Sequence, residues 1–404
     1  MPVRHPEKYE EHPGHDERTP IPPRSLFLIS LPVSQEQTDR RYHRQMLLPD
    51  WGEDAQRRIR EARVLVIGAG GLGSPVLLYL TAAGVGTIGI VEYDCVEETN
   101  LHRQILFRNS DIGRSKASLA AQRLHEQNPD VAIEPHEVYL TAATALDIFS
   151  RYDIVVDGSD NLPTRYLVND ACVLAGKVLV SGAVYRMEGQ VSVFHQLLAD
   201  GSRSADYRDL FPEPPPASLV PACGEAGVLG PLVGWVGTIM AVEVLKLITG
   251  TGETLHGRLM VMDASDSTTR IVRYGRRADR VPLSGLIDYE SFCDRMPPAE
   301  GITELTPTEA HARLAANKLM IVDVREPDEF KRANIGGVNL PLGQVVLQAY
   351  RIPKQIQVML VCKSGNRSVQ AIRKLEDAGF SNLVSLRGGL DRWRAEVDGS
   401  LPAC

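Results

Sequence analysis

A cysteine at the start of a short cationic stretch is the residue of this chain best suited to covalent chemistry. The stretch reads Cys362-Lys363-Ser364-Gly365-Asn366-Arg367. An apolar run at 357–361 precedes it and predicts a buried strand, and a helix is predicted at about 369–378. Backbone N–H groups at a strand-to-helix turn favour a thiolate, as do nearby cations. We therefore predict that Cys362 attacks a substrate or carries a sulfur atom. The alternative is a buried, inert thiol.

The length of this loop separates two kinds of cysteine chemistry. Dual-specificity phosphatases place five residues between the cysteine and the arginine, whereas four separate Cys362 from Arg367. The shorter loop resembles that of rhodanese-like sulfurtransferases, as do the motifs at 322–327 (VDVREP) and 387–390 (RGGL), and the resemblance covers roughly 303–400. It implies that Cys362 becomes a persulfide held by the loop amides. It also implies that Asp323 and Arg325 form a structural ion pair.

A glycine-rich turn upstream predicts a phosphate site. A strand-like run at 63–67 leads into a G-x-G-x-x-G motif and a helix-like segment at 74–83. The glycines of the motif, which let the backbone approach phosphate closely, are Gly68, Gly70, Gly71 and Gly73. A second predicted strand at 86–91 ends at Glu92, whose carboxylate suits ribose hydroxyls. Taken alone, these features predict a nicotinamide or flavin dehydrogenase.

Further charged and polar side chains change that interpretation. They are Arg44, Asp94, Asn100, Arg103, Lys116, Asp160 and Asn161. Each one alone is explained as a surface charge or a turn former. Together they suit phosphoryl or adenylyl transfer, in which triphosphate charge must be neutralised and a metal held. The sequence has no G-x-x-x-x-G-K-[ST] loop, so P-loop chemistry is excluded.

These motifs resemble the ubiquitin-activating-like adenylyltransferases of the molybdopterin-synthase and thiamine-biosynthesis type. The matching stretch runs from Arg41 to about Ile271 and includes Val180-Ser181-Gly182-Ala183 and the segment 223–230. With the rhodanese-like part, the chain is similar to a fused adenylyltransferase–sulfurtransferase. The resemblance implies ATP and Mg²⁺, and a small ubiquitin-like sulfur-carrier protein ending in Gly-Gly. It also implies a sulfur donor, either thiosulfate or a cysteine-desulfurase persulfide.

The resemblance assigns a role to individual residues. Arg44 matches an arginine that reaches the ATP phosphates from a partner subunit, which implies a homodimer. Arg103 and Lys116 match the cations that grip the triphosphate. Glu92 matches the ribose-binding acid, and Asp160 matches the magnesium-binding acid.

Other matches are less direct. Gly70 and Gly71 are expected against the nucleotide, Asn100 on its phosphate side, and Asp94 and Asn161 beside it. Cys223 matches the second cysteine of the family and lies in a Pro-rich crossover segment, where a structural thiol is the alternative.

Zinc is not expected in this chain. Many relatives bind it through two C-x-x-C pairs, which should fall near 206–209 and 281–284. The residues at the four ligand positions are Asp206, Asp209, Val281 and Ser284. Because two carboxylates, a valine and a serine cannot rebuild a soft thiolate site, we predict no structural zinc.

Composition sets the outer bounds. The chain has 404 residues, a net charge of −7 and 43% hydrophobic residues, so neither nucleic acid nor an anionic membrane is an expected general partner. Six cysteines without a C-x-x-C pair predict free thiols in a reducing cytoplasm. The apolar stretch at 226–242 contains five glycine or proline residues and predicts a buried helix rather than a membrane span.

Alternation of strand-like and helix-like runs predicts an α/β fold with two catalytic domains. The expected parts are a flexible N-terminal extension at 1–38, a Rossmann-like ATP-binding domain at 39–270, a linker at 271–302 and a smaller rhodanese-like domain at 303–404. Three alternatives stay open. They are a dehydrogenase with a rhodanese-like regulatory domain, a non-catalytic scaffold, and an activator that conjugates a ubiquitin-like protein through a Cys223 thioester.

Overall fold

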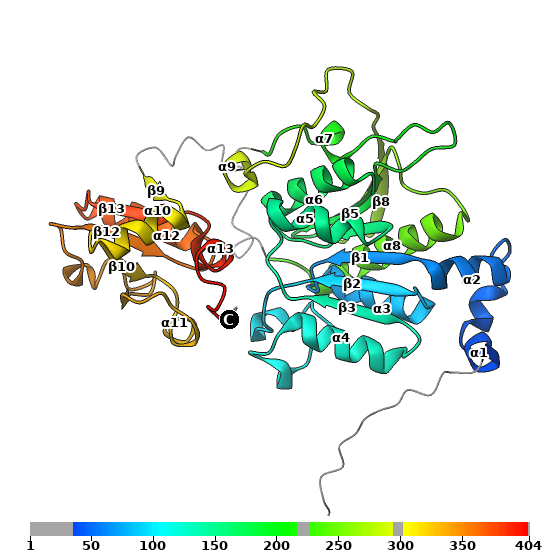
Figure 1. Cartoon of the computed structure of the whole chain (residues 1–404), viewed down its shortest axis with the longest axis horizontal. Coiled ribbons are helices and arrows are strands. Elements are labelled where there is room, and N and C mark those ends of the chain that lie inside the picture. Colours follow the sequence, from blue (N-terminus) through cyan, green and yellow to red (C-terminus); the bar gives the residue numbers. More distant parts are fainter. Residues whose placement is uncertain (1–34, 216–226, 294–301, 403–404) are drawn as a thin grey trace, which may run out of the picture. The chain divides into compact units, whose positions relative to one another are not determined.

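Two sheets organise the chain. The structure is a computed structural model that describes residues 35–215, 227–293 and 302–402 (Figure 1). The larger sheet has eight strands in the order β3-β2-β1-β4-β5-β6-β7-β8, and the smaller has five in the order β11-β10-β12-β13-β9. Both sheets are flanked by helices, so the predicted α/β fold class is confirmed.

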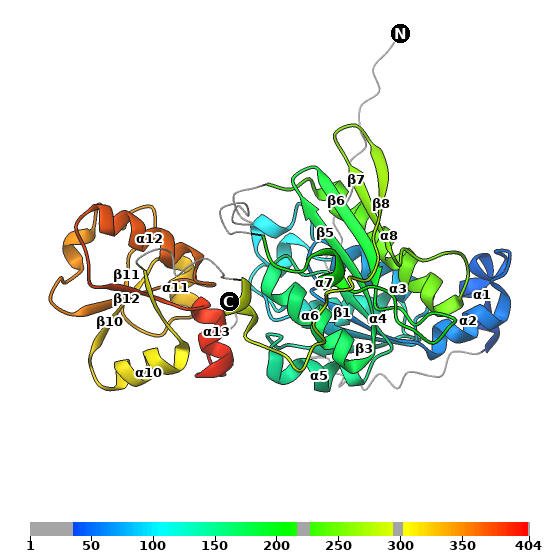
Figure 2. The same cartoon turned by 90° about the horizontal axis from the view of Figure 1, so that it is seen from above.

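Five parallel strands form the first half of the larger sheet. They are β1 (Arg63–Ile67), β2 (Thr87–Val91), β3 (Ala132–His136), β4 (Ile154–Asp157) and β5 (Val178–Tyr185). An antiparallel extension follows, made of β6 (Glu188–Phe194), β7 (Arg258–Asp263) and β8 (Thr268–Arg273) (Figure 2). The strand-like runs predicted at 63–67, 87–92, 153–157, 178–182 and 190–195 correspond to β1, β2, β4, β5 and β6.

Helices cover both faces of this sheet because successive residues of a buried strand point to opposite sides. Val64 and Val66 of β1 belong to one core cluster, and Leu65 and Ile67 belong to the other. The helices of the first cluster are α2 (Gly52–Glu61), α3 (Gly73–Ala83), α4 (Lys116–Gln127) and α8 (Gly230–Thr249). The second cluster contains α5 (Ala142–Ser150), α6 (Leu162–Ala175) and α9 (Tyr289–Cys293).

The apolar helix α8 is a core element. Among the described residues it is the one helix with the length and composition to cross a membrane. Its side chains Leu232, Val236 and Met240 are nevertheless buried in the cluster that includes Val180 and Val191 of the sheet. The apolar side chains of α8 are thus buried within the domain, and α8 is the buried helix predicted from the sequence.

The carboxyl ends of β1, β2 and β4 lie side by side. Ile67 pairs with Val91 in β2 and with Asp157 in β4, so the strand order reverses on either side of β1. Open α/β sheets bind ligands at such a reversal, outside the carboxyl ends of the strands. The glycine-rich loop, Glu92 and the segment 157–161 therefore meet at one edge.

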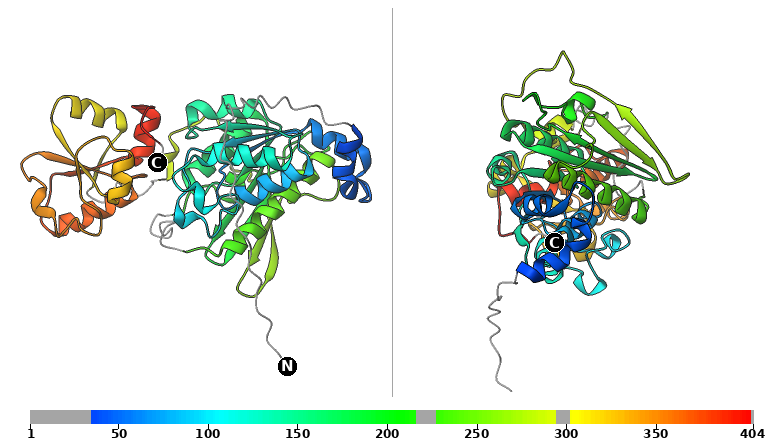
Figure 3. Two further views of the ribbon diagram at one scale, coloured as in Figure 1. Left: turned by 90° about the horizontal axis from the view of Figure 1, so that it is seen from below. Right: turned by 90° about the vertical axis from the view of Figure 1, so that its right-hand side faces the viewer.

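The opposite edge of the sheet carries the N-terminal helices. A short N-terminal unit ends at Arg40, and α1 (Gln35–Met46) crosses this boundary. Tyr42 accepts a hydrogen bond from Asn128 after α4, and Gln45 donates to the Ala83 carbonyl at the end of α3. Figure 3 shows this end of the domain, in blue, toward the viewer in its right-hand panel.

The smaller domain repeats the layered plan. Its strands are β9 (Thr303–Leu305), β10 (Leu319–Asp323), β11 (Val338–Asn339), β12 (Gln357–Val361) and β13 (Leu383–Leu386), all parallel. Its helices are α10 (Pro307–Ala315), α11 (Pro327–Arg332), α12 (Asn366–Asp377) and α13 (Gly389–Glu396). Val358 and Leu360 of β12 pack toward α12, and Met359 and Val361 pack toward α10 and α13.

Two sequence-based segment boundaries need correction. Residues 1–34 of the expected flexible extension lie outside the described residues, but 35–38 are helical in α1. Part of the expected linker at 271–302 also belongs to ordered structure. Strand β8 continues to Arg273, and Tyr289 in α9 donates a hydrogen bond to Asp170 of α6 at 2.7 Å. The connection between β8 and α9, from 274 to 288, is thus shorter than the predicted linker at 271–302.

The glycine at the start of α3 is required by close backbone packing. A Cβ atom at position 73 would lie 1.9 Å from the carbonyl oxygen of Gly68. We predict that Gly73→Ala destabilises the larger domain by about 1–3 kcal/mol, because the glycine-rich loop must shift. The measurement is thermal unfolding followed by circular dichroism.

Gly234→Ala in α8 is the matched control, because a Cβ there meets nothing within 4 Å. Alanine favours a helix over glycine, so this variant should unfold at the same or a higher temperature. Equal unfolding temperatures for Gly73→Ala and the unsubstituted protein would contradict the packing argument.

Candidate active sites

The Glu92 carboxylate ties the glycine-rich loop to the end of β2. One of its oxygens accepts a hydrogen bond from the backbone N–H of Ala69 at 3.0 Å, and the other accepts from the N–H groups of Tyr93 and Asp94 at 2.8 Å. Burial raises the pKa of Glu92, against the opposing effects of Lys116 and these N–H donors. The side chain is 8% exposed and directly follows β2, and its contact with ribose stays a prediction.

The glycine-rich loop packs against the segment after β2. A Cβ at Gly71 would lie 3.5 Å from Cγ of Arg103, and a Cβ at Gly70 would lie 3.5 Å from the amide nitrogen of Gln104. The Arg103 guanidinium donates to the Thr99 carbonyl at 3.0 Å. The structure therefore places Arg103 beside the glycine-rich loop, and its contact with a triphosphate stays a prediction.

Lys116 begins α4 and is buried, with 4% exposure. Its ammonium nitrogen lies 3.4 Å from a carboxylate oxygen of Asp94, which follows β2. Asn100 is also buried, and its side-chain oxygen accepts from the N–H of Glu97 at 3.3 Å, capping a short 3₁₀ helix. Lys116, Asp94 and Asn100 thus lie on the segment that flanks the nucleotide edge.

The loop after β4 is held by a buried carboxylate. Asp157 accepts from the N–H and hydroxyl of Ser159 at 3.0 and 2.6 Å, and from the hydroxyl of Ser181 at 3.2 Å. Arg165 forms an ion pair with Asp157 at 3.6 Å and donates to the Ser159 carbonyl at 2.9 Å. We did not predict Asp157 and Arg165 as site residues from the sequence. Arg165 lies one helical turn after Asn161, and this spacing could have indicated its place beside the loop.

Asp160 and Asn161 complete this loop. Asp160 is exposed at the carboxyl edge of the sheet. The side-chain oxygen of Asn161 accepts from the N–H of Thr164 at 2.9 Å and caps α6. Asp160 is therefore solvent-exposed, and Asn161 has a structural role as the cap of α6.

Arg44 does not join these residues within its own chain. It is exposed in the last turn of α1, at the edge of the sheet opposite the glycine-rich loop. Leu47 and Leu48, which follow it, are 64% and 51% exposed. Arg44 can contribute to a phosphate site only if that site belongs to another copy of the chain.

The cysteine loop forms the second site. Cys362 is buried, with 1% exposure, and its sulfur accepts a hydrogen bond from the N–H of Gly365 at 3.1 Å. Gly365 has φ of +99° and precedes α12, so the loop wraps around the sulfur as predicted. Lys363 is half-buried, Ser364 is exposed, and Asn366 starts the helix.

Two ion pairs support this loop. Arg367 makes two 2.7 Å hydrogen bonds to the Glu329 carboxylate of α11. Arg325 and Asp323 form a buried ion pair at 2.7 Å, and Arg325 also donates to the Ala333 carbonyl. The structure thus contains the Asp323–Arg325 ion pair expected from the sequence.

The other cysteines divide into three groups. Cys223 and Cys404 lie outside the described residues. Cys172 and Cys293 are thiols that form no disulfide, as expected. Cys95 forms a disulfide, so the expectation of free thiols is wrong for this residue.

An ion-pair cluster lies where relatives would hold zinc. Asp206 and Asp209 both pair with Arg280, the latter at 3.3 Å. Asp206 also caps α7 (Tyr207–Leu210) through the N–H of Arg208. The two carboxylates, with 1% and 0% side-chain exposure, are therefore neutralised by an arginine.

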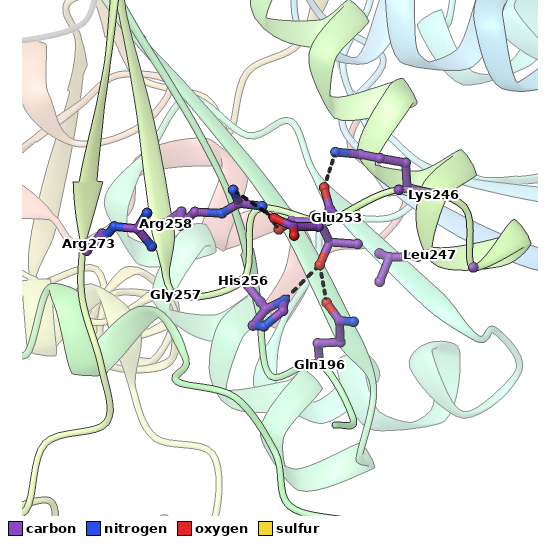
Figure 4. Close-up of a pocket in the computed structure, with 11 residues that line it drawn as sticks. Gln196, Lys246, Leu247, Glu253, His256, Gly257, Arg258 and Arg273 are labelled. Carbon is purple, nitrogen blue, oxygen red and sulfur yellow. Dashed lines mark hydrogen bonds and ion pairs between the residues drawn. The ribbon is translucent and has the colours of Figure 1, made fainter. Parts of the chain in front are cut away.

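A separate cavity of about 530 Å³ lies at the end of α8 (Figure 4). Several of its polar side chains already have protein partners. Lys246 donates to the Glu253 carbonyl at 2.7 Å, Arg258 pairs with Glu253 at 3.4 Å, and Thr254 bonds His256. The cavity has neither a glycine-rich loop nor the candidate site residues.

The two sites define the class of protein. A nucleotide crevice with cations and acids is fused to a domain whose cysteine is cradled by backbone amides. Residues 42–283 match the ThiF family model, and residues 306–396 match the rhodanese-like domain model. The chain belongs to the ThiF family and carries a rhodanese-like domain, and it is an enzyme with adenylyltransferase and sulfurtransferase parts.

Three relatives illustrate the similarity. The protein named "Probable adenylyltransferase/sulfurtransferase MoeZ" of Mycobacterium tuberculosis is 44% identical over 388 residues, covering 94% of this chain and 98% of the relative. The sulfur carrier protein adenylyltransferase of Thermus thermophilus is 51% identical over 267 residues, 64% of this chain and 98% of the relative. Adenylyltransferase and sulfurtransferase MOCS3 of Bos taurus is 38% identical over 421 residues, covering 95% and 90%.

Solved structures share the fold. The crystal structure of Escherichia coli MccB has a TM-score of 0.54 and 20% identity, covering 62% of this chain and 75% of that one. At this level of identity the likeness supports the fold alone.

We predict that the ion pairs of Arg280 with Asp206 and Asp209 stabilise the larger domain. Arg280→Met leaves two buried carboxylates without a cation, which should destabilise the larger domain by about 3–5 kcal/mol. Thermal unfolding of the full chain measures the effect. Arg277→Met is the control, because the Arg277–Asp279 pair is 42% and 69% exposed and should contribute little.

Stoichiometric zinc in purified protein, measured by elemental analysis, would contradict the assignment of this cluster as an ion pair. So would an Arg280→Met variant that unfolds at the same temperature as Arg277→Met.

Proposed function

We propose that this enzyme adenylates the C-terminal Gly-Gly carboxylate of a small ubiquitin-like sulfur-carrier protein and then converts it to a thiocarboxylate. The observation that carries the proposal is the presence of both sites on one chain. The names of two relatives describe both activities, and a third relative is named a sulfur carrier protein adenylyltransferase. The pathway that uses the carrier is not part of the proposal.

The first step is attack of the carrier carboxylate on the α-phosphate of ATP, with pyrophosphate leaving. Arg103 and Lys116 supply positive charge beside the glycine-rich loop, where developing phosphate charge needs it. Glu92 holds the ribose side, and Gly70 and Gly71 lie along the nucleotide. The product is an acyl-adenylate, and this step needs no protein nucleophile.

Magnesium is proposed as the companion of the triphosphate. Asp160 is an exposed oxygen donor, which suits this hard cation. Among residues 35–215, 227–293 and 302–402, no cluster of three or more His, Cys, Asp or Glu side chains could hold a metal ion. Nucleotide oxygens would therefore complete the coordination, as is usual for Mg²⁺ in nucleotide sites. Asp157 and Arg165 position the Asp160 loop.

We propose a homodimer, and the position of Arg44 supports it. Its place at the opposite edge of its own sheet leaves a second subunit as the source of an arginine for each site. The exposed Leu47 and Leu48 beside it provide apolar surface for such an interface.

The second step transfers sulfur. Cys362 accepts a sulfane sulfur from thiosulfate or from a cysteine-desulfurase persulfide. The terminal sulfur of the resulting persulfide attacks the acyl-adenylate, and AMP leaves with the bonding electron pair. Thiol attack on Cys362, by Cys223 in our proposal, forms a disulfide and releases the thiocarboxylate, and an external thiol reductant restores both cysteines. Because Cys362 is 1% exposed, the loop must open for these partners.

We place the enzyme in the cytoplasm. Nucleic acid and membranes are not among the proposed partners. Conjugation through a Cys223 thioester is the second candidate activity, and the fused sulfur-loading domain argues against it. Carrier-dependent pyrophosphate exchange would exclude a dehydrogenase or a non-catalytic scaffold.

Replacing Cys362 separates the two activities. We expect Cys362→Ala to retain ATP–pyrophosphate exchange with a Gly-Gly carrier, because adenylation needs no thiol, and to form no thiocarboxylate. Isotope exchange and mass spectrometry of the carrier measure the two activities. Cys293→Ala is the thiol control and should retain both. Simultaneous loss of exchange and thiocarboxylate formation in Cys362→Ala would contradict the assignment of adenylation and sulfur transfer to separate sites.

Mixing two inactive variants tests the role of Arg44. If Arg44 acts across the dimer, Arg44→Ala and Asp160→Asn subunits together form one intact site in each mixed dimer. Random reassociation should restore about a quarter of the exchange activity, since half of the dimers are mixed and each has one of two sites intact. Absence of restored activity in verified mixed dimers would mean that Arg44 does not act in this way.

A further inference from the structure

Two buried hydroxyl groups lie beneath the cysteine loop and have no assigned role. Ser368 is in the first turn of α12, and Ser385 is in β13, seventeen residues further along the chain. Both serines are 0% exposed. The Ser368 oxygen lies 3.7 Å from the Cys362 sulfur, 2.6 Å from the Gly365 carbonyl oxygen and 2.8 Å from the Ser385 oxygen.

The number of protons decides the direction of these bonds. A serine hydroxyl donates one hydrogen bond and accepts up to two, whereas a carbonyl oxygen can only accept. Ser368 therefore donates to Gly365, and the hydroxyl of Ser385 donates to Ser368. In the thiol form, the S–H of Cys362 can donate to the remaining lone pair of Ser368. All hydrogen-bonding capacity of Ser368 is then used.

Negative charge on the sulfur changes this arrangement. Once the sulfur has lost its proton, it can accept a second hydrogen bond besides the one from the Gly365 N–H. The Ser368 hydroxyl can supply it by rotating from the Gly365 carbonyl toward the sulfur. Ser385 donates to Ser368 in both arrangements and so keeps the oxygen in place while its proton turns.

We propose that Ser385 is a positioning residue for sulfur transfer, which holds the Ser368 hydroxyl ready to donate to anionic sulfur at Cys362. The proposal rests on Cys362 being the sulfur carrier of the proposed function. When an acceptor such as cyanide attacks the outer sulfur of the persulfide, the S–S bond breaks and its electron pair stays on Cys362. The Ser368 proton stabilises that leaving thiolate.

A packing role alone does not account for the pair. Ser385 lies in a strand whose neighbours Val384 and Leu386 are buried, and Ser368 is followed by the buried Ala371 and Ile372. Placing hydroxyls in such surroundings costs free energy unless they are hydrogen-bonded. The geometry joins both hydroxyls to each other and directs Ser368 to the Cys362 sulfur.

The experiment uses the full chain with Ser385→Ala. The rate of Cys362 alkylation by iodoacetamide, followed by peptide mass spectrometry, should require a higher pH than in the unsubstituted protein. Turnover of thiosulfate and cyanide should fall roughly 3–10-fold in kcat, the effect of one hydrogen bond, with KM for thiosulfate little changed. ATP–pyrophosphate exchange should not change, because Ser385 belongs to the sulfur-transfer domain.

Two variants complete the test. Ser385→Thr keeps a hydroxyl on the strand and should recover the pH profile and kcat. Ser368→Ala removes the direct hydrogen-bond donor and should lower kcat at least as much as Ser385→Ala does. This variant also tests the proposal if Ser385→Ala folds poorly.

The outcomes are distinguishable. An unchanged alkylation profile in both alanine variants, with only a lower unfolding temperature, overturns the proposal and leaves a structural pair. If the unsubstituted protein transfers no sulfur from thiosulfate, that donor assignment fails. The alkylation profiles then still decide whether the serines act on the Cys362 sulfur.

Discussion

The close backbone approach of three glycines is the constraint on which the nucleotide edge depends. Gly68, with φ of +88°, lies so near Gly73 and Gly158 that a Cβ at 73 would meet the Gly68 carbonyl at 1.9 Å and one at 68 would meet the Gly158 carbonyl at 3.2 Å. This packing joins the ends of β1 and β4 directly. Glu92 joins the end of β2 to the same loop through backbone N–H groups. The ends of β1, β2 and β4 are therefore held together, and the exposed Asp160 follows β4.

Both sites use backbone amides at a strand-to-helix turn, but with different surroundings. In the proposed function, the glycines of the glycine-rich loop, which have no side chains, would let a phosphate approach the backbone, and Arg103 and Lys116 would supply positive charge. The cysteine loop instead closes on a buried sulfur, and Gly365 supplies the N–H at 3.1 Å. A phosphate needs space and cations, whereas a sulfur anion gains from a short, enclosed set of donors. Both loops therefore connect a strand to a helix, and they suit ligands of different size.

Charge compensation by Arg280 stabilises the outer part of the larger domain. Asp206 and Asp209 are buried, and Arg280 pairs with both across about seventy residues of chain. Asp209 also accepts the N–H of Arg277 at 3.0 Å. These bonds fasten the segment after β8 to α7, and Tyr289 fastens α9 to α6. This explains why residues expected as a linker are part of the domain.

Local patterns in the sequence determined several of the strands, the glycine motif and the cysteine loop, because each depends on residues close together in the chain, whereas the Asp323–Arg325 pair was expected from the resemblance to rhodanese-like proteins. The predicted strands at 63–67 and 357–361 match β1 and β12 because both are continuous buried runs. Strand β8 was missed because all six of its residues are exposed and have no apolar pattern. Only the tertiary structure decided the partners of Arg165, Arg280 and Ser385, and the position of Arg44 opposite its own site. These depend on which strands are neighbours, and strand order follows from contacts between residues far apart in sequence.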